Sequence, residues 1–189
     1  MSKRGITRRS LRAIAYLSLA AAIQAFAVGP SLEAGSTSQW ERMLFAAHTY
    51  SAITRHFAHW EGVPGLDFDE SFEAYVRTIA GQDSRRDFDM ATLKLVTGLN
   101  NGHAGFQDPW LQSHSGAAVG INVLHRNDGW IVITSQRQGI RPGDQITKID
   151  GAPFDEFYNS LAAYIPSSSD RARRNWLSSI PYYGRNAFD

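Results

Sequence analysis

The chain has 189 residues, which is room for one ordinary domain or two small ones. Hydrophobic residues make up 43% of the sequence and charged residues 20%, a composition typical of globular rather than disordered proteins. The formal net charge of +1 argues against a strongly basic nucleic-acid binder, and the lack of any cysteine in the sequence excludes disulfides, thiolate zinc sites and cysteine catalysis.

Residues 1–34 have the pattern of a secretory signal and a short lead-in. Basic residues and no acidic one lie ahead of an apolar run over residues 13–28, which is shorter than the ~20 residues that a membrane-spanning helix needs. Ala25-Phe26-Ala27 offers a small-residue cleavage site. The segment Thr7–Leu11 also resembles a twin-arginine export signal. We therefore expect an exported protein, periplasmic or extracellular, that meets the membrane only transiently; an uncleaved anchor helix is the alternative.

Residues 38–106 predict a small helical bundle. Apolar residues recur with a helical period, and turn residues separate the runs. Asp side chains ahead of two of these runs are suited to cap helix N-termini. The three predicted helices extend from Trp40 to Trp60, from a cap at Asp67 or Asp69 to Gly81, and from a cap at Asp87 or Asp89 to the Asn100-Asn101-Gly102 turn.

After Gly116 the hydrophobic period changes from 3.6 to 2, which predicts strands. We expect strands over 119–124, 130–134 and 145–149, with a hairpin turn at Asn127-Asp128-Gly129 and a helix over 154–165. Together they predict an α+β fold in which the bundle precedes a small β-barrel domain over residues 116–165. Residues 166–189 begin a further segment, opened by a capping box at Ser167–Asp170.

The run from Gly139 to Gly151 resembles the "G-L-x-P-G-D-x-I-x-x-I-D-G" signature of bacterial PDZ-like domains. Pro142 fixes φ for the turn, and Gly143 supplies a permissive backbone beside it. Ile146 and Ile149 are expected to face the core. The resemblance implies that residues 116–165 form a PDZ-like barrel.

A second resemblance lies at the end of the bundle. The segment Leu99–Phe106 is similar to the "L-x-D-G-H-T-x-F" loop of the tail-specific, or C-terminal-processing, serine peptidases, which include the tricorn core protease. Asn101 stands in place of the usual acid, and Ala104 in place of the usual Thr. The order of export signal, bundle, loop and PDZ-like module matches the N-terminal half of that family over roughly residues 40–185.

This family resemblance implies a catalytic role for His103. In one branch of the family a histidine from this loop activates the nucleophilic serine, as a neutral imidazole can at neutral pH; in another branch a lysine does so. The alternative is that His103 only braces the turn. Beyond the signal the sequence holds Lys94 and Lys148, and neither is placed as a buried base.

The sequence offers no serine in a G-x-S-x-G elbow, and the family places its nucleophile after the PDZ-like module. We therefore expect an N-terminal fragment of a longer peptidase, with its serine beyond Asp189 and no hydrolysis by this chain alone.

The family also implies a polypeptide partner that is held by its C-terminus. PDZ-like domains add an extended peptide as a strand and bind its carboxylate with backbone amides. Here the loop "G-I-G-[IL]" corresponds to residues 118–121, so the amides of Val119, Gly120 and Ile121 are the predicted carboxylate site. Ile121 and Val123 would line the pocket for the terminal side chain; the alternative is an ordinary core strand.

We predict no functional site at the remaining polar clusters. His48, His56 and His59 lie on one stretch without a suitable further ligand, so no metal site and no cofactor is predicted. The basic residues of the 171–174 segment are predicted to form a solvated face and not a nucleic-acid site. Besides the peptidase half, two hypotheses stay open: a stand-alone exported adaptor that binds peptide C-termini, and a structural domain whose PDZ-like signature is fortuitous.

Overall fold

The computed structural model describes residues 37–114, 119–127 and 129–179. The predicted signal over residues 1–34, Ala118 of the predicted carboxylate loop and residues 180–189 lie outside these ranges. Helices and small antiparallel sheets are both present, so the predicted α+β class is confirmed. None of the described helices combines the length and the hydropathy that a bilayer-spanning segment requires.

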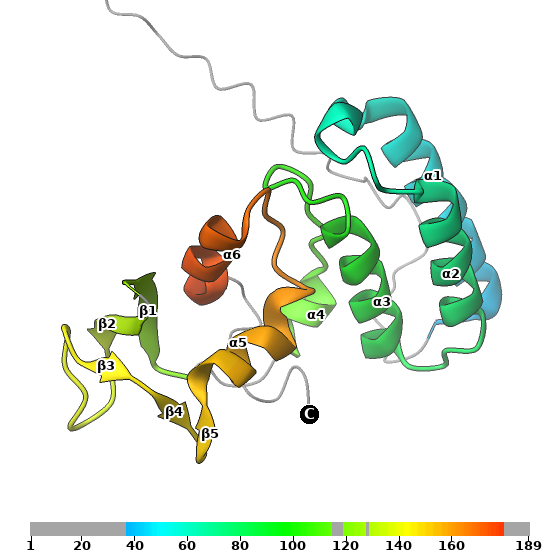
Figure 1. Cartoon of the computed structure of the whole chain (residues 1–189). Helices are drawn as coiled ribbons and strands as arrows, with labels where there is room; N and C mark the ends of the chain where they lie inside the picture. The colour runs from blue at the N-terminus through cyan, green and yellow to red at the C-terminus, as the bar shows by residue number, and fades with distance from the viewer. Residues whose placement is uncertain (1–36, 115–118, 128, 180–189) are drawn as a thin grey trace, which may run out of the picture.

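The first half is a helical bundle, as predicted (Figure 1). It contains α1 (Gln39–His56), α2 (Phe68–Ala80) and α3 (Arg85–Thr97), with the short 3₁₀ turn η1 (Trp60–Gly62) between the first two. The predicted first helix thus ends four residues early and is followed by a separate turn. Apolar side chains of the three helices share one core with Phe57, Leu99 and Ala104.

The helix caps were predicted correctly for α2 and wrongly for α3. Asp67 accepts a hydrogen bond from the Glu70 amide at 2.9 Å, which satisfies a first-turn N–H of α2. For α3 the cap is Ser84, whose hydroxyl accepts from the Asp87 amide, and not Asp87 or Asp89. Asp89 lies a full turn inside α3, where it is completely buried.

The second half contains two short antiparallel sheets. Strands β1 (Ile121–Arg126), β2 (Gly129–Ser135) and β3 (Gln145–Ile146) form one sheet in the order β1-β2-β3, so β1 and β3 are its edges. Strands β4 (Lys148–Ile149) and β5 (Ala152–Pro153) form the other. The described strands therefore make two open sheets and not a closed barrel.

Helices complete the second half. The unpredicted α4 (Pro109–Ser113) precedes the sheet, α5 (Phe154–Ala162) follows β5, and α6 (Asp170–Trp176) continues into the 3₁₀ turn η2 (Leu177–Ser179). The predicted Ser167–Asp170 run supplies the N-cap of α6, because Ser169 accepts from the Ala172 amide, but the N3 residue is Ala172 and no capping box forms. Ser167 instead lies buried and donates to the Ser169 carbonyl.

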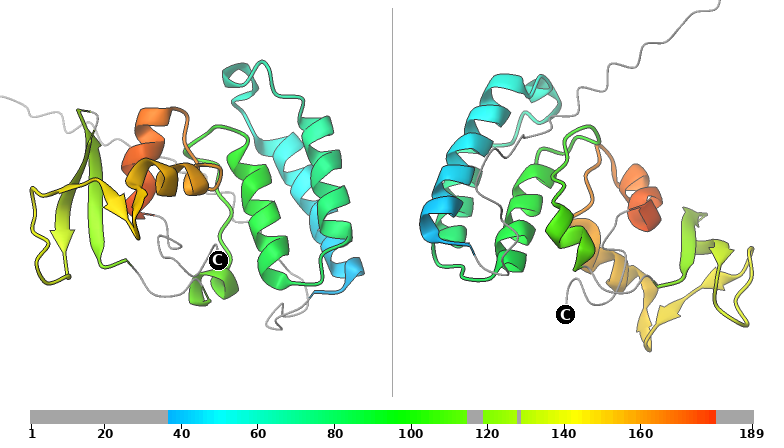
Figure 2. Two further views of the ribbon diagram at one scale, coloured as in Figure 1. Left: turned by 60° about the horizontal axis from the view of Figure 1, so that its bottom comes forward. Right: turned by 180° about the vertical axis from the view of Figure 1, so that it is seen from behind.

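A second hydrophobic core joins the sheet to α5 and to the C-terminal elements. Its buried members include Val123, Trp130, Phe154 and Leu177, and the predicted inward residues Ile146 and Ile149 pack against it half-buried. Figure 2 shows the bundle at one end, the three-stranded sheet at the other, and α5 and α6 between them. Phe106 packs against both cores, so the segment after α3 is where the two halves meet.

Candidate peptide-binding edge and the His103 loop

The loop that enters β1, where the carboxylate site is predicted, turns at a glycine in a left-handed conformation. Gly120 has a φ of +80°, a region that favours glycine because it has no Cβ. Its carbonyl accepts from the Gln136 amide at 2.8 Å, across to the residue after β2. Val119, Gly120 and Ile121 therefore form a tight entry into β1, an edge strand of its sheet.

A cation lies against this loop, and the sequence analysis missed it. The Arg137 Nε donates to the Val119 carbonyl at 2.7 Å, and a Cβ on Gly120 would come within 2.9 Å of the same nitrogen. The Arg137 side chain is exposed, so its guanidinium is available to an anion at the loop. A single arginine in a polar run after a strand carries no sequence signal of such a role.

The apolar residues that were expected to line a pocket are buried. Ile121 is 7% exposed and Val123 is 1% exposed, and both belong to the second core together with the fully buried Leu177. The turn η2 lies along β1: the Val123 amide donates to the Ser178 hydroxyl at 2.8 Å, and that hydroxyl donates back to the Val123 carbonyl at 3.1 Å. The chain itself therefore covers this part of the β1 edge, which the sequence did not predict.

His103 is presented on an exposed turn. Its side chain is exposed, and its backbone N–H donates to Asn101 Oδ1 at 2.7 Å, a local turn typical of Asn and Asp. Asn101 Oδ1 thus accepts the hydrogen bond that a carboxylate oxygen would accept if the usual acid stood at this position. Ala104 is buried in the bundle core, which anchors the next position of the loop. The imidazole is therefore open to solvent.

The loop is also held from the second half of the molecule. Asn100 has a left-handed φ of 47°, and its Oδ1 accepts from Arg173 Nη2 of α6 at 3.1 Å. The same guanidinium reaches the Ile165 carbonyl at 3.4 Å. Two of the three arginines predicted to form a solvated face therefore make internal contacts, because Arg174 pairs with Asp155 and Asp170 at 2.9 Å each.

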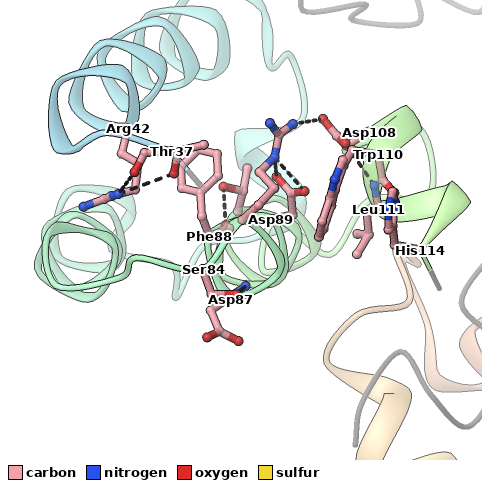
Figure 3. A network of polar contacts seen from close by, with 12 residues as sticks. Thr37, Arg42, Ser84, Asp87, Phe88, Asp89, Asp108, Trp110, Leu111 and His114 are labelled. Carbon is pink, nitrogen blue, oxygen red and sulfur yellow. Dashed lines mark hydrogen bonds and ion pairs between the residues drawn. The ribbon is translucent and has the colours of Figure 1, made fainter. Parts of the chain in front are cut away.

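The most buried charges lie where α3 meets α4 (Figure 3). Arg85, 2% exposed, donates through Nε to both carboxylate oxygens of the fully buried Asp89, at 2.9 and 3.0 Å. It also pairs with Asp108, the N-cap of α4. Burial, and then the negative charge of Asp108, raise the pKa of Asp89 to about 7, although Arg85 opposes the shift.

Sequence reasoning also missed this buried cluster, and its role is structural. The Trp110 ring packs 5.9 Å from the Arg85 guanidinium carbon and stacks on His114 at 4.4 Å. Perturbed carboxyl groups often mark functional sites. Here, however, the carboxylates of Asp89 and Asp108 face an arginine of the same chain, and the contact fixes α4 against α3.

The other candidate residues behave as ordinary surface groups. His48, His56 and His59 are exposed, and the part of the chain that the structure describes contains no cluster of three potential ligands that could hold a metal ion. Lys94 and Lys148 are exposed, which confirms that neither is a buried base. No family model and no curated protein sequence matches the chain.

Proposed function

We propose that this chain is the substrate-binding half of an exported serine-type peptidase of the tail-specific kind, and that its PDZ-like module takes the C-terminus of a polypeptide. One observation carries the proposal. The glycine turn at Gly120 opens an edge strand, and the Arg137 guanidinium lies against that turn. The motifs over residues 99–106 and 139–151 support the same assignment.

The chemistry of this loop suits a terminal carboxylate. Backbone amides at the entry of a strand can donate to one carboxylate oxygen, as in other modules that capture chain termini. Arg137 adds a planar donor that stays charged at any physiological pH and that pairs with carboxylates through two parallel hydrogen bonds. A peptide so held lies alongside β1 and extends its pairing.

A binding titration tests the carboxylate claim. The full chain is titrated against a fluorescein-labelled peptide that ends in a free carboxylate and against the same peptide amidated at its C-terminus. We expect the free acid to bind at least about tenfold more tightly, since a charge-assisted hydrogen bond contributes roughly 1.5–3 kcal/mol. The variant Arg137→Gln should lose this preference, whereas Arg126→Gln, at the exposed far end of β1, should keep it. Equal binding of the two peptides by the unaltered chain would exclude a carboxylate site.

His103 is the proposed general base for a serine supplied by a domain beyond Asp189. A neutral imidazole on an exposed loop can accept the serine proton when that domain packs against it. The chain of 189 residues alone is expected not to hydrolyse peptides.

The intact mass of the native protein from its source cells separates this proposal from the adaptor alternative. A mass well above that of residues 28–189 supports the peptidase, and in that longer enzyme His103→Ala should abolish turnover. A mass equal to the signal-cleaved chain would favour a stand-alone adaptor that binds peptide C-termini. Retained turnover in the His103→Ala enzyme would assign the base to a lysine.

A further inference from the structure

The edge of β1 that does not pair with β2 is the place where a peptide would add, and the protein's own turn η2 lies against it, next to α6, which also contacts β1. A single hydroxyl, that of Ser178, satisfies both the amide and the carbonyl of Val123. Neighbouring Leu177 is 0% exposed in the core that contains Ile121 and Val123. The Ser178 hydroxyl thus satisfies the Val123 main-chain groups that an added strand would pair with, and Leu177 fills an apolar pocket as a peptide side chain would.

We propose that Leu177 and Ser178 occupy the place of a bound peptide at the β1 edge. The peptide site is closed while this segment is in place. Once the segment leaves, the site binds an extended peptide with a Leu-sized aliphatic side chain. The inference rests on the proposed peptide-binding function and adds to it the class of ligand and the means of closure.

The ligand class follows from what the ligand must replace. When Ser178 leaves, the Val123 amide and carbonyl need new partners, because a buried polar group without one is costly. The N–H and C=O of an extended peptide residue supply both. When Leu177 leaves, its volume must be refilled by a side chain of similar size, since protein cores do not tolerate voids. Polar or very small side chains do not meet this second requirement.

The segment can leave without losing the rest of α6. The polar contacts of α6 are made by residues ahead of η2: Arg174 pairs with Asp155 and Asp170, and Arg173 binds Asn100. Leu177 and Ser178 come after these anchors in the chain. A hinge after Trp176 would therefore release the main chain of Val123 and the space filled by Leu177, while α6, which also contacts β1, stays in place.

The test compares Ser178→Ala with Ser71→Ala in the full chain. Ser71 is a matched control because its hydroxyl also donates to a backbone carbonyl, that of Asp67 in the distant bundle, at 2.8 Å. Each variant is titrated with two fluorescein-labelled free-acid peptides that differ only in a C-terminal Leu or Ser. Hydrogen exchange of the Val123 amide is measured without peptide.

We expect Ser178→Ala to lower the Kd for the Leu-ended peptide by roughly three- to tenfold, because the closed state loses both hydrogen bonds. Exchange at Val123 should accelerate, and Ser71→Ala should match the unaltered chain in both measurements. The Leu-ended peptide should bind at least about tenfold more tightly than the Ser-ended one.

Three results would overturn the inference. If peptides bind but Ser178→Ala leaves their affinity unchanged, the segment does not compete and only the peptide site stands. If the two peptides bind equally, the aliphatic ligand class is wrong. If neither the unaltered chain nor Ser178→Ala binds any peptide while Val123 exchange accelerates, η2 covers the edge as predicted but the peptide-binding function itself fails.

Discussion

Replacing Asp89 by Asn should change how the stability of this protein depends on pH. Asp89 is fully buried on α3, and its two carboxylate oxygens accept from Arg85 at 2.9 and 3.0 Å. Burial and the nearby charge of Asp108 raise the pKa of Asp89 to about 7. Asn keeps an acceptor oxygen for Arg85 but cannot titrate. The Asp89→Asn variant therefore removes this proton equilibrium with little change of shape.

The sign and size of the effect follow from linkage between protonation and folding. An unfolded Asp titrates near about 3.9, whereas folded Asp89 titrates near about 7. Between these values the folded state holds a proton that the unfolded state has released, so the free energy of unfolding falls as the pH rises. At roughly 1.4 kcal/mol per pH unit, the titration of Asp89 lowers the free energy of unfolding by up to about 4 kcal/mol from pH 4 to pH 7.

Urea unfolding followed by tryptophan fluorescence, at constant ionic strength and several pH values, measures this dependence. The quantity of interest is the free energy of unfolding of the unaltered protein minus that of the Asp89→Asn variant. This difference should fall steadily from pH 4 to pH 7. The control Asp87→Asn makes the same chemical change on α3 at a side chain that is 47% exposed, and its difference should stay nearly constant. A difference for Asp89→Asn that is flat, or that rises with pH, would refute the reasoning.

The remaining predictions concern the loop and the α6 contacts. Gly120→Ala should lower the free energy of unfolding by about 1–2 kcal/mol, because φ there is +80°. Gly65→Ala, where an added Cβ meets open space, should change it by less than about 1 kcal/mol in urea titrations. Arg174→Met should destabilise by about 1 kcal/mol at low salt and by less in 1 M NaCl, since the two carboxylates that it pairs with are exposed; a salt-independent loss would contradict this. Arg173→Met should accelerate amide exchange around Asn100, measured by mass spectrometry; unchanged exchange would show that the contact does not hold the loop.

Local patterns in the sequence were enough to predict most elements of the fold. The change of hydrophobic period separated the helices from the strands, and the cap at Asp67 was recognisable from its position before an apolar run. The first hairpin was predicted from Asn127-Asp128-Gly129, and Asn127 indeed has a φ of 48°. Each of these features depends on residues that lie close together in the chain.

The features that matter most for the site depend on distant residues. Ser178 and Val123 are 55 positions apart, and the hydroxyl of one serine carries no signal that it will meet a strand edge. Arg85 and Asp108 are separated by 23 positions. The cap of α3 was misassigned because Asp87 and Asp89 are good capping residues by type. Burial of Asp89 against Arg85 overrides that preference, and burial is a property of the whole fold.

The His103 loop and the β1 edge are connected through α6. Asn100 in the loop is bound by Arg173 of α6, and α6 runs directly into the turn that covers Val123. A helix of seven residues has little stability of its own, so its position is set by the contacts that it makes. A change that displaces the whole helix would therefore alter both places, whereas one that displaces only η2 would free the main chain of Val123 and leave the loop as it is. Amide exchange at Asn100 in the Ser178→Ala variant distinguishes these cases: it stays unchanged if only η2 moves and accelerates if α6 moves with it.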